Sequence, residues 1–573
     1  MKKTLLLSML SLLAFTATAC NKEEEDDMID DFVRVEPFDL IFNDGFSNPN
    51  IVTPEKSTFF SIATVEDTSS YDTLSDGDLW PMAWSDDGYI YTPNGDGKGF
   101  DLSSHMADIA MNRVDGHVDT FNVTGERIYP NMEIGQVWGH PNVYNRKPTG
   151  MLSIDGILYM AVQDLNKSET PGIFNDAPNA TILRSDDKGI TWEWNEEEAM
   201  FSNYKFTTIM FLDYGQDSEA NTFDDYVYVY GMDYNWRDSF SNTVSDPQSL
   251  YLARMRKADI QDRSQWEFYT GDLDGNASWS APGEIDERTP VLTDKRRVYN
   301  NAISGNSKSM SVISQGSIVY NEAIDRYIYS SWTEYTFEFY EAPTPWGPWK
   351  HFLQKDFGPY PWKNNRFGGY ATVMPSKFIS EDGTTMWISS STFAGKINKY
   401  NMSLRKLNVA LANNTVAENT KNSDNLANPE NGSQATGVSM ATSLGLKNKL
   451  NDGSKTVWDT SYNGLQKTVD YWGIVWNQAY NMNELVYTVG RVNAEEGGWF
   501  TDFKVQVRRD NEWHDVENLY VSSDYPYDAT LESFAEVTFK FDDTHGDGIR
   551  VIGVPGGPLY YTSAAELEVF FRD

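Results

Sequence analysis

The chain has 573 residues, and its 46 Lys and Arg against 84 Asp and Glu give a formal net charge of −38. This acidity argues against a nucleic-acid partner, because phosphate contacts need clustered Lys and Arg. The single cysteine excludes an internal disulfide framework and any multi-cysteine metal site. Aromatic residues make up 14% of the chain, so most of it is expected to pack into cores rather than to be disordered.

The first 19 residues have the order of an export signal. Lys2 and Lys3 form a short basic start, residues 4–15 are apolar, and residues 17–19 are the small residues of a cleavage site. The apolar run is too short to span a membrane as a helix. Residues 1–19 are therefore predicted to be a signal peptide.

The only cysteine, Cys20, stands directly after this cleavage site. The arrangement resembles a bacterial lipoprotein signal, in which Cys20 would be lipidated, although Ala17 stands where Leu is usual. The acidic residues 21–27 resemble the tag by which Bacteroidota send lipoproteins to the cell surface. We expect residues 20–35 to be an acidic tether and the protein to be a surface-exposed lipoprotein of the outer membrane. Cleavage by ordinary signal peptidase would instead leave a secreted or periplasmic protein.

Short strands are predicted from about residue 70 to residue 410. Alternating, aromatic-rich runs are separated by Asp-Gly or Asn-rich turns, as at residues 85–91, 154–160 and 380–388. A strand, a tight acidic turn and a second strand are typical of the inner hairpin of a propeller blade. Residues 185–192 match an Asp-box, which we interpret as a folding element of sialidase-like propellers and not as a catalytic motif.

Five such hairpins can be counted along this region. Their first strands are predicted to begin near Asp78, Lys147, Thr207, Ser311 and Tyr370. The spacing predicts an all-β fold with a five-bladed β-propeller over residues 36–410. A longer interval before the fourth hairpin predicts a loop insertion within residues 270–305, and the strand at residues 38–42 is a candidate to close the ring.

This region resembles a bacterial propeller family described as domain of unknown function 4185. The resemblance rests on the order and spacing of residues 77–84, 94–97, 147–150, 250–254 and 342–349. It implies a five-bladed fold akin to glycosidase propellers. Some relatives cleave glycans, including D-arabinan, but most are uncharacterised and the substrate does not transfer to this chain.

A second domain is predicted after a linker at residues 411–423, which are rich in Asn, Ala, Thr and Ser. Residues 424–573 resemble a discoidin domain (coagulation factor 5/8 type C), also classed as carbohydrate-binding module family 32. The matching pieces include residues 425–427, 450–454, 471–473, 497–500 and 548–553. The resemblance implies an eight-stranded β-sandwich jelly roll that binds a polysaccharide or oligosaccharide.

The same resemblance implies a structural Ca²⁺ site, because Asp452, Thr456 and Glu566 fall where the family places side-chain ligands. Oxygen ligands suit this hard cation. The alternative is an Asp-Gly turn beside an exposed Glu at a strand end. Tyr525 and Tyr527 lie in a predicted loop and could stack on a sugar ring, because aromatic faces pack on the apolar face of a pyranose. Trp499 could do the same, with core packing as its alternative.

Candidate catalytic residues follow from blade geometry. Glycoside hydrolysis needs two carboxylates across the scissile bond, and in a propeller the starts of inner strands and the loops after second strands meet at one mouth. This geometry selects Asp78 and Asp96 of the first blade and Glu334 of a later loop as catalytic candidates. Asp164 and Asp233 occupy equivalent loops, and Asp96 could alternatively just turn the chain.

Other residues near the predicted mouth are candidates for substrate binding. Lys147 and Arg366 could neutralise an anionic sugar or position a hydroxyl group. Three tryptophans could stack on sugar rings: Trp80, Trp236 and Trp332.

The function predicted from these features is a surface-anchored glycoside hydrolase that acts on a complex polysaccharide. The discoidin-like domain would tether it to substrate and so raise the local concentration. Two alternatives stay open. One is a non-catalytic glycan-binding protein, and the other is a lyase or dehydratase acting on uronic acids, with Lys147, Tyr370 or His140 as its base.

Overall fold

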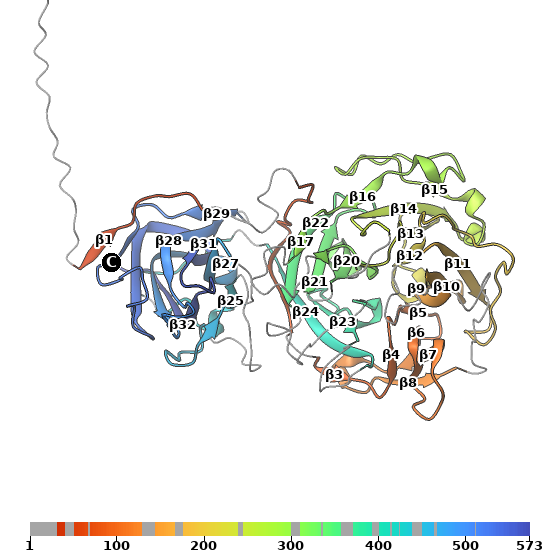
Figure 1. Ribbon diagram of the computed structural model, residues 1–573, viewed down its shortest axis with the longest axis horizontal. Helices are drawn as coiled ribbons and strands as arrows, with labels where there is room; N and C mark the ends of the chain where they lie inside the picture. Colours follow the sequence, from red (N-terminus) through yellow and green to blue (C-terminus); the bar gives the residue numbers. More distant parts are fainter. Residues whose placement is uncertain are drawn as a thin grey trace, which may run out of the picture.

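The computed structural model describes residues 31–573 apart from several short gaps. The gaps are residues 41–50, 67–68, 129–143, 167–175, 239–243, 299–309, 334–335, 357–370, 392–399, 413–414, 423, 438–449, 463–466 and 510–511. The described chain is built from strands and confirms the predicted all-β class. None of its helices has the length and apolar character needed to cross a bilayer. The strands form two bodies, which lie side by side in Figure 1.

The helices are single 3-10 turns. They are η1 (Val118–Thr120), η2 (Gln216–Ser218), η3 (Lys257–Asp259), η4 (Arg263–Gln265), η5 (Ile285–Glu287), η6 (Glu322–Ile324), η7 (Ser376–Phe378) and η8 (Pro429–Asn431).

The larger body is a ring of strands that divides into five antiparallel groups, the blades of the predicted propeller (Figure 1). The third and fourth blades form one continuous sheet, because Leu212 and Ile318 lie opposite each other in a parallel strand pair. The first blade holds β4 (Asp76–Asp78), β5 (Ala83–Trp84), β6 (Ile90–Gly99), β7 (Ala107–Asp115) and β8 (Thr124–Arg127). The second holds β9 (Tyr144–Ile154), β10 (Ile157–Asn166) and β11 (Asn179–Ser185). The third holds β12 (Thr208–Asp213), β13 (Tyr226–Met232), β14 (Ser249–Arg256), β15 (Glu267–Phe268) and β16 (Pro290–Thr293).

The fourth and fifth blades complete the ring. The fourth holds β19 (Ser317–Asn321), β20 (Arg326–Trp332), β21 (Thr336–Ala342) and β22 (Lys350–Asp356). The fifth holds β23 (Thr385–Ser390), β24 (Ser403–Leu411), β2 (Phe60–Val65) and β3 (Tyr71–Asp72). A separate small pair is formed by β17 (Arg297–Val298) and β18 (Met310–Ser311).

Turn chemistry explains why the inner hairpins form. Between β9 and β10 the two turn residues, Asp155 and Gly156, have φ of 52° and 73°, which is the left-handed pair that a two-residue hairpin needs. The Asp-box also has its predicted local structure. Asp187 accepts the backbone N–H of Thr191 at 2.8 Å, and the indole of Trp192 donates to the Gly189 carbonyl at 3.1 Å. Acidic turns therefore set the register of the blades.

The ring is closed by an N-terminal strand, as in a propeller whose last sheet is shared between both ends of its domain. That strand is β2, which pairs with β24 in the register Ile62 to Ala410. The prediction that residues 38–42 close the ring was therefore wrong, because Phe38 lies against Lys504 of the smaller body instead. The predicted insertion at 270–305 is also partly regular, since β16 returns to pair with β14.

At one end of the ring, hydrogen bonds join blades that are not neighbours in the ring. Asp213, the last residue of β12 in the third blade, accepts hydrogen bonds from the hydroxyl and the backbone N–H of Ser376 of the fifth blade at 2.9 and 3.1 Å. Gln216 of the third blade donates to the Ser85 carbonyl of the first blade at 3.1 Å. These bonds join the turns of the inner hairpins. Asp96 lies in the second half of β6, away from the turn at Ser85 that precedes this strand, and Asp78 pairs with Gly95 beside it.

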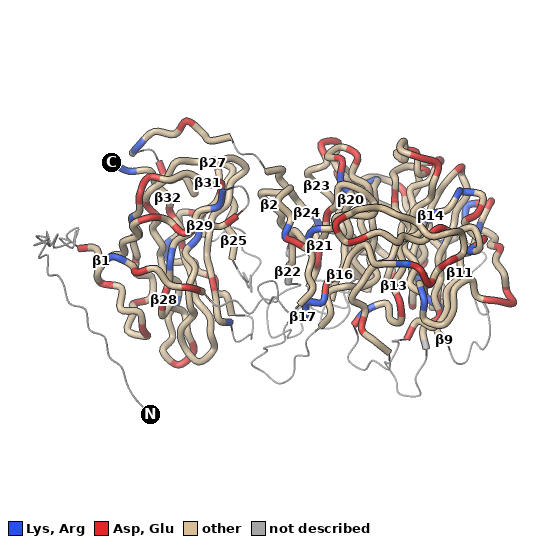
Figure 2. Tube along the Cα trace, turned by 90° about the horizontal axis from the view of Figure 1, so that it is seen from above, with Lys and Arg blue, Asp and Glu red and all other residues tan. Residues whose placement is uncertain are grey.

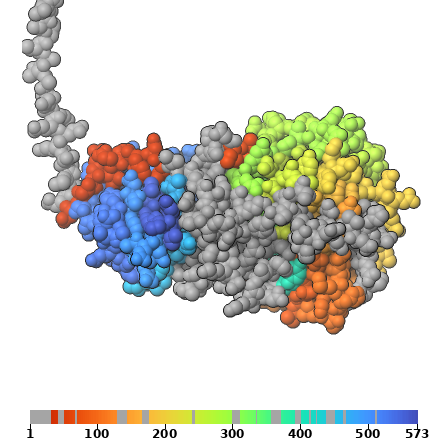
Figure 3. All heavy atoms as spheres, viewed as in Figure 1, coloured from red at the N-terminus to blue at the C-terminus, as the bar shows by residue number. Residues whose placement is uncertain are grey.

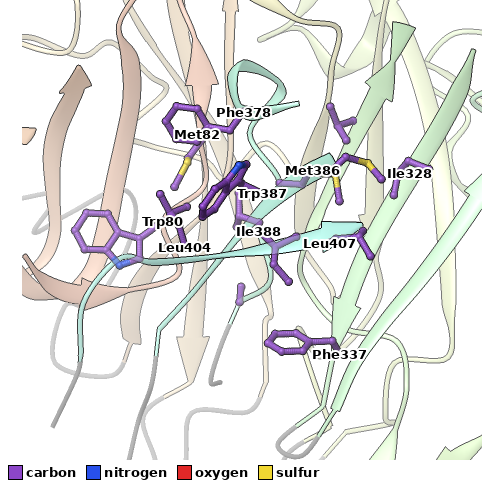
Figure 4. Close-up of a cluster of buried hydrophobic side chains, with 14 of the residues drawn as sticks. Trp80, Met82, Ile328, Phe337, Phe378, Met386, Trp387, Ile388, Leu404 and Leu407 are labelled. Atoms are coloured by element: carbon purple, nitrogen blue, oxygen red, sulfur yellow. The ribbon is translucent and has the colours of Figure 1, made fainter. Parts of the chain in front are cut away.

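The first, fourth and fifth blades enclose one continuous hydrophobic core. Trp80, Met82, Phe378 and Trp387 point into it together, as Figure 4 shows. The indole of Trp80 is 1% exposed. Asp and Glu mark many of the loops of both bodies (Figure 2).

The smaller body is a β-sandwich whose two longest strands bend from one sheet into the other. Its strands are β25 (Gln434–Gly437), β26 (Asp459–Thr460), β27 (Asp470–Val489), β28 (Phe500–Arg509), β29 (Glu512–Asp515), β30 (Tyr520–Ser522), β31 (Glu536–Pro555) and β32 (Ser563–Phe570). The N-terminal half of β27 pairs with β25 and β31, and its C-terminal half with β31 and β32. Trp472 and Trp476 are fully buried between the sheets.

The smaller body also includes residues from the N-terminus of the chain. β1 (Phe32–Arg34) lies antiparallel to β30, with Val33 opposite Val521. In Figure 3 this red segment lies on the blue C-terminal body. The last residues of the predicted tether are therefore a strand. Two residues of the predicted linker also belong to strand pairings, because Leu411 ends β24 and Val416 forms a bridge with Ala479.

Candidate functional site

Asp78 is the centre of the candidate site. It ends the short strand β4 and lies opposite Gly95 of β6. Its side chain is buried, its Oδ2 accepts a hydrogen bond from the Tyr400 hydroxyl, and its Oδ1 has no hydrogen-bond partner within the described residues. Burial raises the pKa of Asp78 to about 6, helped by the nearby Asp96 and opposed by Lys147. Asp78 can therefore carry a proton close to neutral pH.

The fit around Asp78 requires glycine at position 95. A Cβ added to Gly95 would lie 2.4 Å from the Asp78 Oδ1 and 3.1 Å from the Cδ of Lys147. Real Cβ atoms do not approach an oxygen so closely, so any side chain here would displace the carboxylate. Gly95 is thus part of the wall that orients Asp78.

Asp96 and Lys147 form the second half of the site. The Lys147 ammonium lies 2.7 Å from Asp96 Oδ1, and it also donates to Asn145 Oδ1 at 2.9 Å and to the Asp108 carbonyl at 3.2 Å. Three acceptors match the three hydrogens of an ammonium group. Lys147 therefore positions Asp96, and its hydrogens are already used within the protein rather than directed at a substrate anion. The Asp96 side chain is 32% exposed, so it borders solvent.

The backbone around this pair is strained. Leu79, Trp80 and Asp96 have positive φ of 69°, 47° and 36°, and non-glycine residues adopt such values at an energetic cost. Strain of this kind persists where surrounding contacts impose it and is common at functional sites. Asp96 does not turn the chain, since the segment 94–97 lies within β6.

A cation and two tryptophans lie at the same end of the ring. Arg237 follows β13, and its guanidinium lies 4.7 Å from the ring centre of Trp236 and 5.8 Å from that of Trp332. Its charge lowers the pKa of Asp78, so it faces the same centre. Trp236 and Trp332 are 4% and 1% exposed. They hold Arg237 between blades and do not present the open stacking faces that were predicted.

Trp80 differs from its predicted role in the same way. Its indole N–H donates to the Gly77 carbonyl at 3.0 Å, and its ring packs edge-on against Phe100. A ring buried on all sides cannot stack on a sugar. The structure therefore assigns Trp80 to the core, where it supports the backbone next to Asp78.

The other acidic candidates of the described mouth are bound in ion pairs. Asp164 is fully buried and lies 3.0 Å from the Nε of Arg146. Asp233 lies 2.5 Å from Arg288 and accepts the backbone N–H of Phe206 at 2.8 Å. Asp164 lies within β10 and not in the predicted loop, so its ion pair joins β10 to β9, whereas Asp233 follows β13 and holds the segment at Phe206. Asp78 and Asp96 remain the acidic pair of this site.

Several predicted residues lie outside the described part of the chain. They are Cys20, His140, Glu334, Arg366 and Tyr370. Their roles stay predictions.

Three functional residues were not identified from the sequence. Asn145 lies two residues before Lys147 in β9, and this spacing places both side chains on one face of the strand, which is a usable signal. Arg237 follows the candidate Trp236. Tyr400 has no sequence signal, because it is 322 residues from Asp78, the carboxylate that it contacts.

The two tyrosines proposed for sugar binding in the sandwich differ in exposure. Tyr525 is buried, and its hydroxyl donates to the carbonyl and accepts from the N–H of Phe500, each at 3.0 Å. The structure therefore assigns it to the core. Tyr527 is 36% exposed and stacks one face on Phe503 at 5.1 Å. Trp499 is 6% exposed, which favours core packing.

The predicted metal ligands bring two carboxylates together at one end of the sandwich. Glu566 accepts the backbone N–H of Gly453 at 3.1 Å, while its buried Oε2 has no hydrogen-bond partner in the described chain. Burial raises the pKa of Glu566 to about 7, and the nearby charge of Asp452 adds to this rise. Asp452 and Thr456 are exposed on the adjoining loop. An orphaned buried oxygen beside a second carboxylate fits a cation, although the described residues contain no group of three or more His, Cys, Asp or Glu suited to a metal.

The fold and the site define a class: a five-bladed propeller with a buried Asp78 and a partly exposed Asp96 at one mouth, joined to a β-sandwich. The sequence matches the profile of the family described as "Domain of unknown function (DUF4185)" over residues 82–404, more than half of the chain. The chain belongs to this family. No curated protein matches the sequence significantly.

Several solved structures are similar to parts of the chain. A carbohydrate-binding module from Clostridium perfringens, CpGH89CBM32-5, solved with GalNAc-β-1,3-galactose, is 22% identical and covers 25% of this chain and 97% of its own, with a TM-score of 0.20. The family 32 module of Clostridium perfringens NanJ, solved with galactose, is 16% identical and covers 25% and 96%, with a TM-score of 0.20. A putative hydrolase from Bacteroides ovatus is 13% identical and covers 59% and 87%, with a TM-score of 0.35.

Proposed function

We propose that the propeller is a glycoside hydrolase in which Asp78 and Asp96 are the two catalytic carboxyl groups. The observation that carries this proposal is the environment of Asp78. Its carboxyl group has a pKa of about 6 because it is buried, and it lies beside a second carboxylate positioned by Lys147. A pair of carboxyl groups in different environments is what acid–base cleavage of a glycosidic bond requires.

The proposed reaction assigns one role to each group. Asp78 donates its proton to the glycosidic oxygen as the bond from that oxygen to the anomeric carbon breaks. Asp96 acts on the opposite side, either by taking a proton from the attacking water or by forming the bond to the anomeric carbon that water later hydrolyses. Tyr400 orients the carboxyl group of Asp78 through its hydrogen bond to Oδ2. The products are two shorter sugar chains, one with a new reducing end.

The sandwich is proposed to bind carbohydrate and to keep the propeller on its polymer. Asp452, Thr456 and Glu566 would hold a structural Ca²⁺, together with carbonyl oxygens of the 452–456 loop. The cation would neutralise the orphaned oxygen of Glu566 and order this loop. Its role is structural, since it lies in the sandwich and not at the Asp78 centre.

The protein is further proposed to be a lipoprotein, anchored through Cys20 on the outer surface of the outer membrane. This location suits an enzyme whose substrate is too large to enter the cell. Labelling with a radioactive fatty acid in wild-type and Cys20→Ser cells tests the anchor, and surface proteolysis of intact cells tests the exposure.

The function is tested with soluble polysaccharides of different chemistry: arabinan, galactan, pectin and chondroitin sulfate. New reducing ends without ultraviolet absorbance from unsaturated uronates indicate hydrolysis, whereas that absorbance indicates elimination. Binding in an affinity gel with neither signal indicates a glycan-binding protein. Asp78→Asn and Asp96→Asn should each abolish hydrolysis, while Asp225→Asn, a change at a side chain that is 94% exposed, should not. Full activity in both site variants would contradict the assignment.

A further inference from the structure

A groove borders the Asp78 centre on one side. Its volume is about 310 Å³, and it lies between the start of the first blade and the chain that enters β24 of the fifth. The residues that line it include Leu74, Asp76, Lys98, Leu102, Tyr400 and Asn401. They lie at the same end of the ring as Asp78, opposite the end at which the hairpin turns are bonded together.

Two elements are shared between the groove and the catalytic centre. The side chain of Tyr400 lines the groove, and its hydroxyl donates to Asp78. Asp76 lies two residues before Asp78 in β4, so the same short strand contributes to both. A ligand in the groove would therefore lie next to the acid, separated from it by the Tyr400 side chain.

The groove combines apolar and polar groups. Leu74 and Leu102 are 84% and 50% exposed, which is unusual for large apolar side chains beside a concave site. Asp76 and Lys98 add one negative and one positive charge. The side-chain oxygen of Asn401 has no hydrogen-bond partner within the described chain, although its amide donates to the Thr73 carbonyl at 3.0 Å.

These features match what a sugar ring needs. The apolar face of a pyranose packs on aliphatic or aromatic side chains, and its hydroxyl groups bond to carboxylates, amides and ammonium groups. One acid and one base give the groove no net charge, which favours a neutral ring over a uronate. Tyr400 borders the groove and also contacts Asp78. We therefore expect the groove to hold a neighbouring sugar unit of the polymer that binds at Asp78.

We infer that this groove is a subsite that binds a neutral sugar unit of the substrate chain beside the bond that is cleaved. The inference rests on the proposed hydrolase function, because the groove is a substrate subsite only if the neighbouring Asp78 acts as the acid that cleaves the chain. It adds Leu74 and Leu102 as residues that determine substrate length and identity.

A thiol placed at the rim tests occupancy without relying on catalysis. The chain has one cysteine, so Cys20→Ser removes every native thiol, and Leu74→Cys then places a single thiol in the groove. Leu273→Cys provides the control, because Leu273 is 39% exposed on the third blade. Alkylation by iodoacetamide is followed in the presence of arabinan, galactan, pectin or chondroitin sulfate. The cleaved polymer should slow alkylation several-fold at residue 74 and leave residue 273 unaffected.

The outcomes separate this inference from the hydrolase proposal. Cleavage of a polymer without protection at residue 74 overturns the subsite and leaves the hydrolase standing. Protection at residue 74 without cleavage supports sugar binding in the groove and contradicts the hydrolase. Equal protection at residues 74 and 273 contradicts the subsite. No protection at residue 74 and no cleavage of any polymer also contradicts it. As a second readout, Leu74→Ser with Leu102→Ser should raise KM several-fold with kcat little changed, because binding is lost without loss of chemistry.

Discussion

A carboxyl group buried without a full set of partners reduces stability once it ionises, and Asp78 is such a group. Its pKa is about 6 in the folded protein against an ordinary value of 3.8. Between these values the folded state binds the proton more tightly than the unfolded state. The stability contributed by protonated Asp78 is therefore complete below pH 3.8 and is lost as the pH rises through 6.

Asp78→Asn should consequently raise stability where wild-type Asp78 is ionised, while it abolishes hydrolysis. We expect a higher Tm than wild type at about pH 8 and little or no gain at about pH 4, where both side chains are neutral. Thermal unfolding at the two pH values measures the effect, with Asp225→Asn as the exposed control. A Tm difference that does not change with pH would show that Asp78 is not the group responsible.

Lys147 has two effects that one variant can separate. Its charge lowers the pKa of Asp78, and its ammonium holds Asp96 through a 2.7 Å contact. Lys147→Met should therefore move the upper pH limit of hydrolysis upward, because Asp78 keeps its proton to higher pH. It should also lower kcat by about 100-fold or more, since Asp96 loses its position. A pH–rate profile with an unchanged upper limit would contradict this coupling.

Among the strands, β6 is unusual because its glycine-rich end forms the wall of the site. Gly95→Ala would bring a methyl group to 2.4 Å from the Asp78 carboxylate. We expect loss of hydrolysis with a cost of about 1–3 kcal/mol in the free energy of unfolding. Gly88→Ala is the comparison for the steric effect, because no atom lies within 4 Å of a Cβ added at Gly88, although Gly88, unlike Gly95, has a positive φ of 85°. It should lose some stability through backbone strain and keep its activity.

The blades could be predicted from sequence because their information is local. The Asp155–Gly156 pair fixes a two-residue hairpin by its own backbone angles, and repetition of such turns sets the strand order. That order also brought Asp78, Asp96 and Lys147 together, since equivalent strand ends meet at one mouth. In the structure the Lys147 ammonium lies 2.7 Å from Asp96, and the charges of both residues shift the pKa of Asp78, so the three lie together as predicted.

What the sequence did not predict depends on long-range packing. Residue type does not tell whether an indole plugs a core or faces a sugar, so Trp80, Trp236 and Trp332 were assigned to stacking although they are buried. Tyr400 reaches Asp78 only because the ring closes between the fifth and first blades. The closing strand β2 was missed for a similar reason, since its partner β24 lies more than 330 residues further along the chain.

In the sandwich, the proposed cation has a measurable effect on the whole protein. Adding a chelator to the calcium-loaded full chain should lower the Tm of the transition that reports the sandwich, because the orphaned oxygen of Glu566 loses its partner. Glu566→Gln should lower the Tm in calcium and abolish the response to chelator. Glu536→Gln, at a carboxylate that is 53% exposed, should retain the response. Equal Tm values with and without chelator in wild type would contradict a structural Ca²⁺.

At the scale of the whole molecule, the N-terminal segment joins the C-terminal body. The backbone N–H of Val35 donates to the Leu519 carbonyl at 2.8 Å, and the N–H of Ser523 donates to the Asp31 carbonyl at 2.9 Å. The Lys540 ammonium lies 4.4 Å from the ring centre of Phe32. With Cys20 lipidated as proposed, the 11 residues from 21 to 31 reach at most about 40 Å when extended. The sandwich would then be the body held near the membrane.

This arrangement predicts a specific disulfide in a chain with Cys20→Ser. Arg34 lies opposite Tyr520 at a position without mutual backbone hydrogen bonds, where Cα atoms approach to about 4.5 Å. Arg34→Cys with Tyr520→Cys should therefore crosslink under mild oxidation and raise the Tm, because Cα atoms at this distance suit a disulfide. Arg34→Cys with Ser522→Cys moves one thiol two residues along the strand, to about 7–8 Å, and should crosslink poorly. Equal crosslinking of the two pairs would mean that β1 is not held in this register, and the sandwich would then be free of the N-terminal segment.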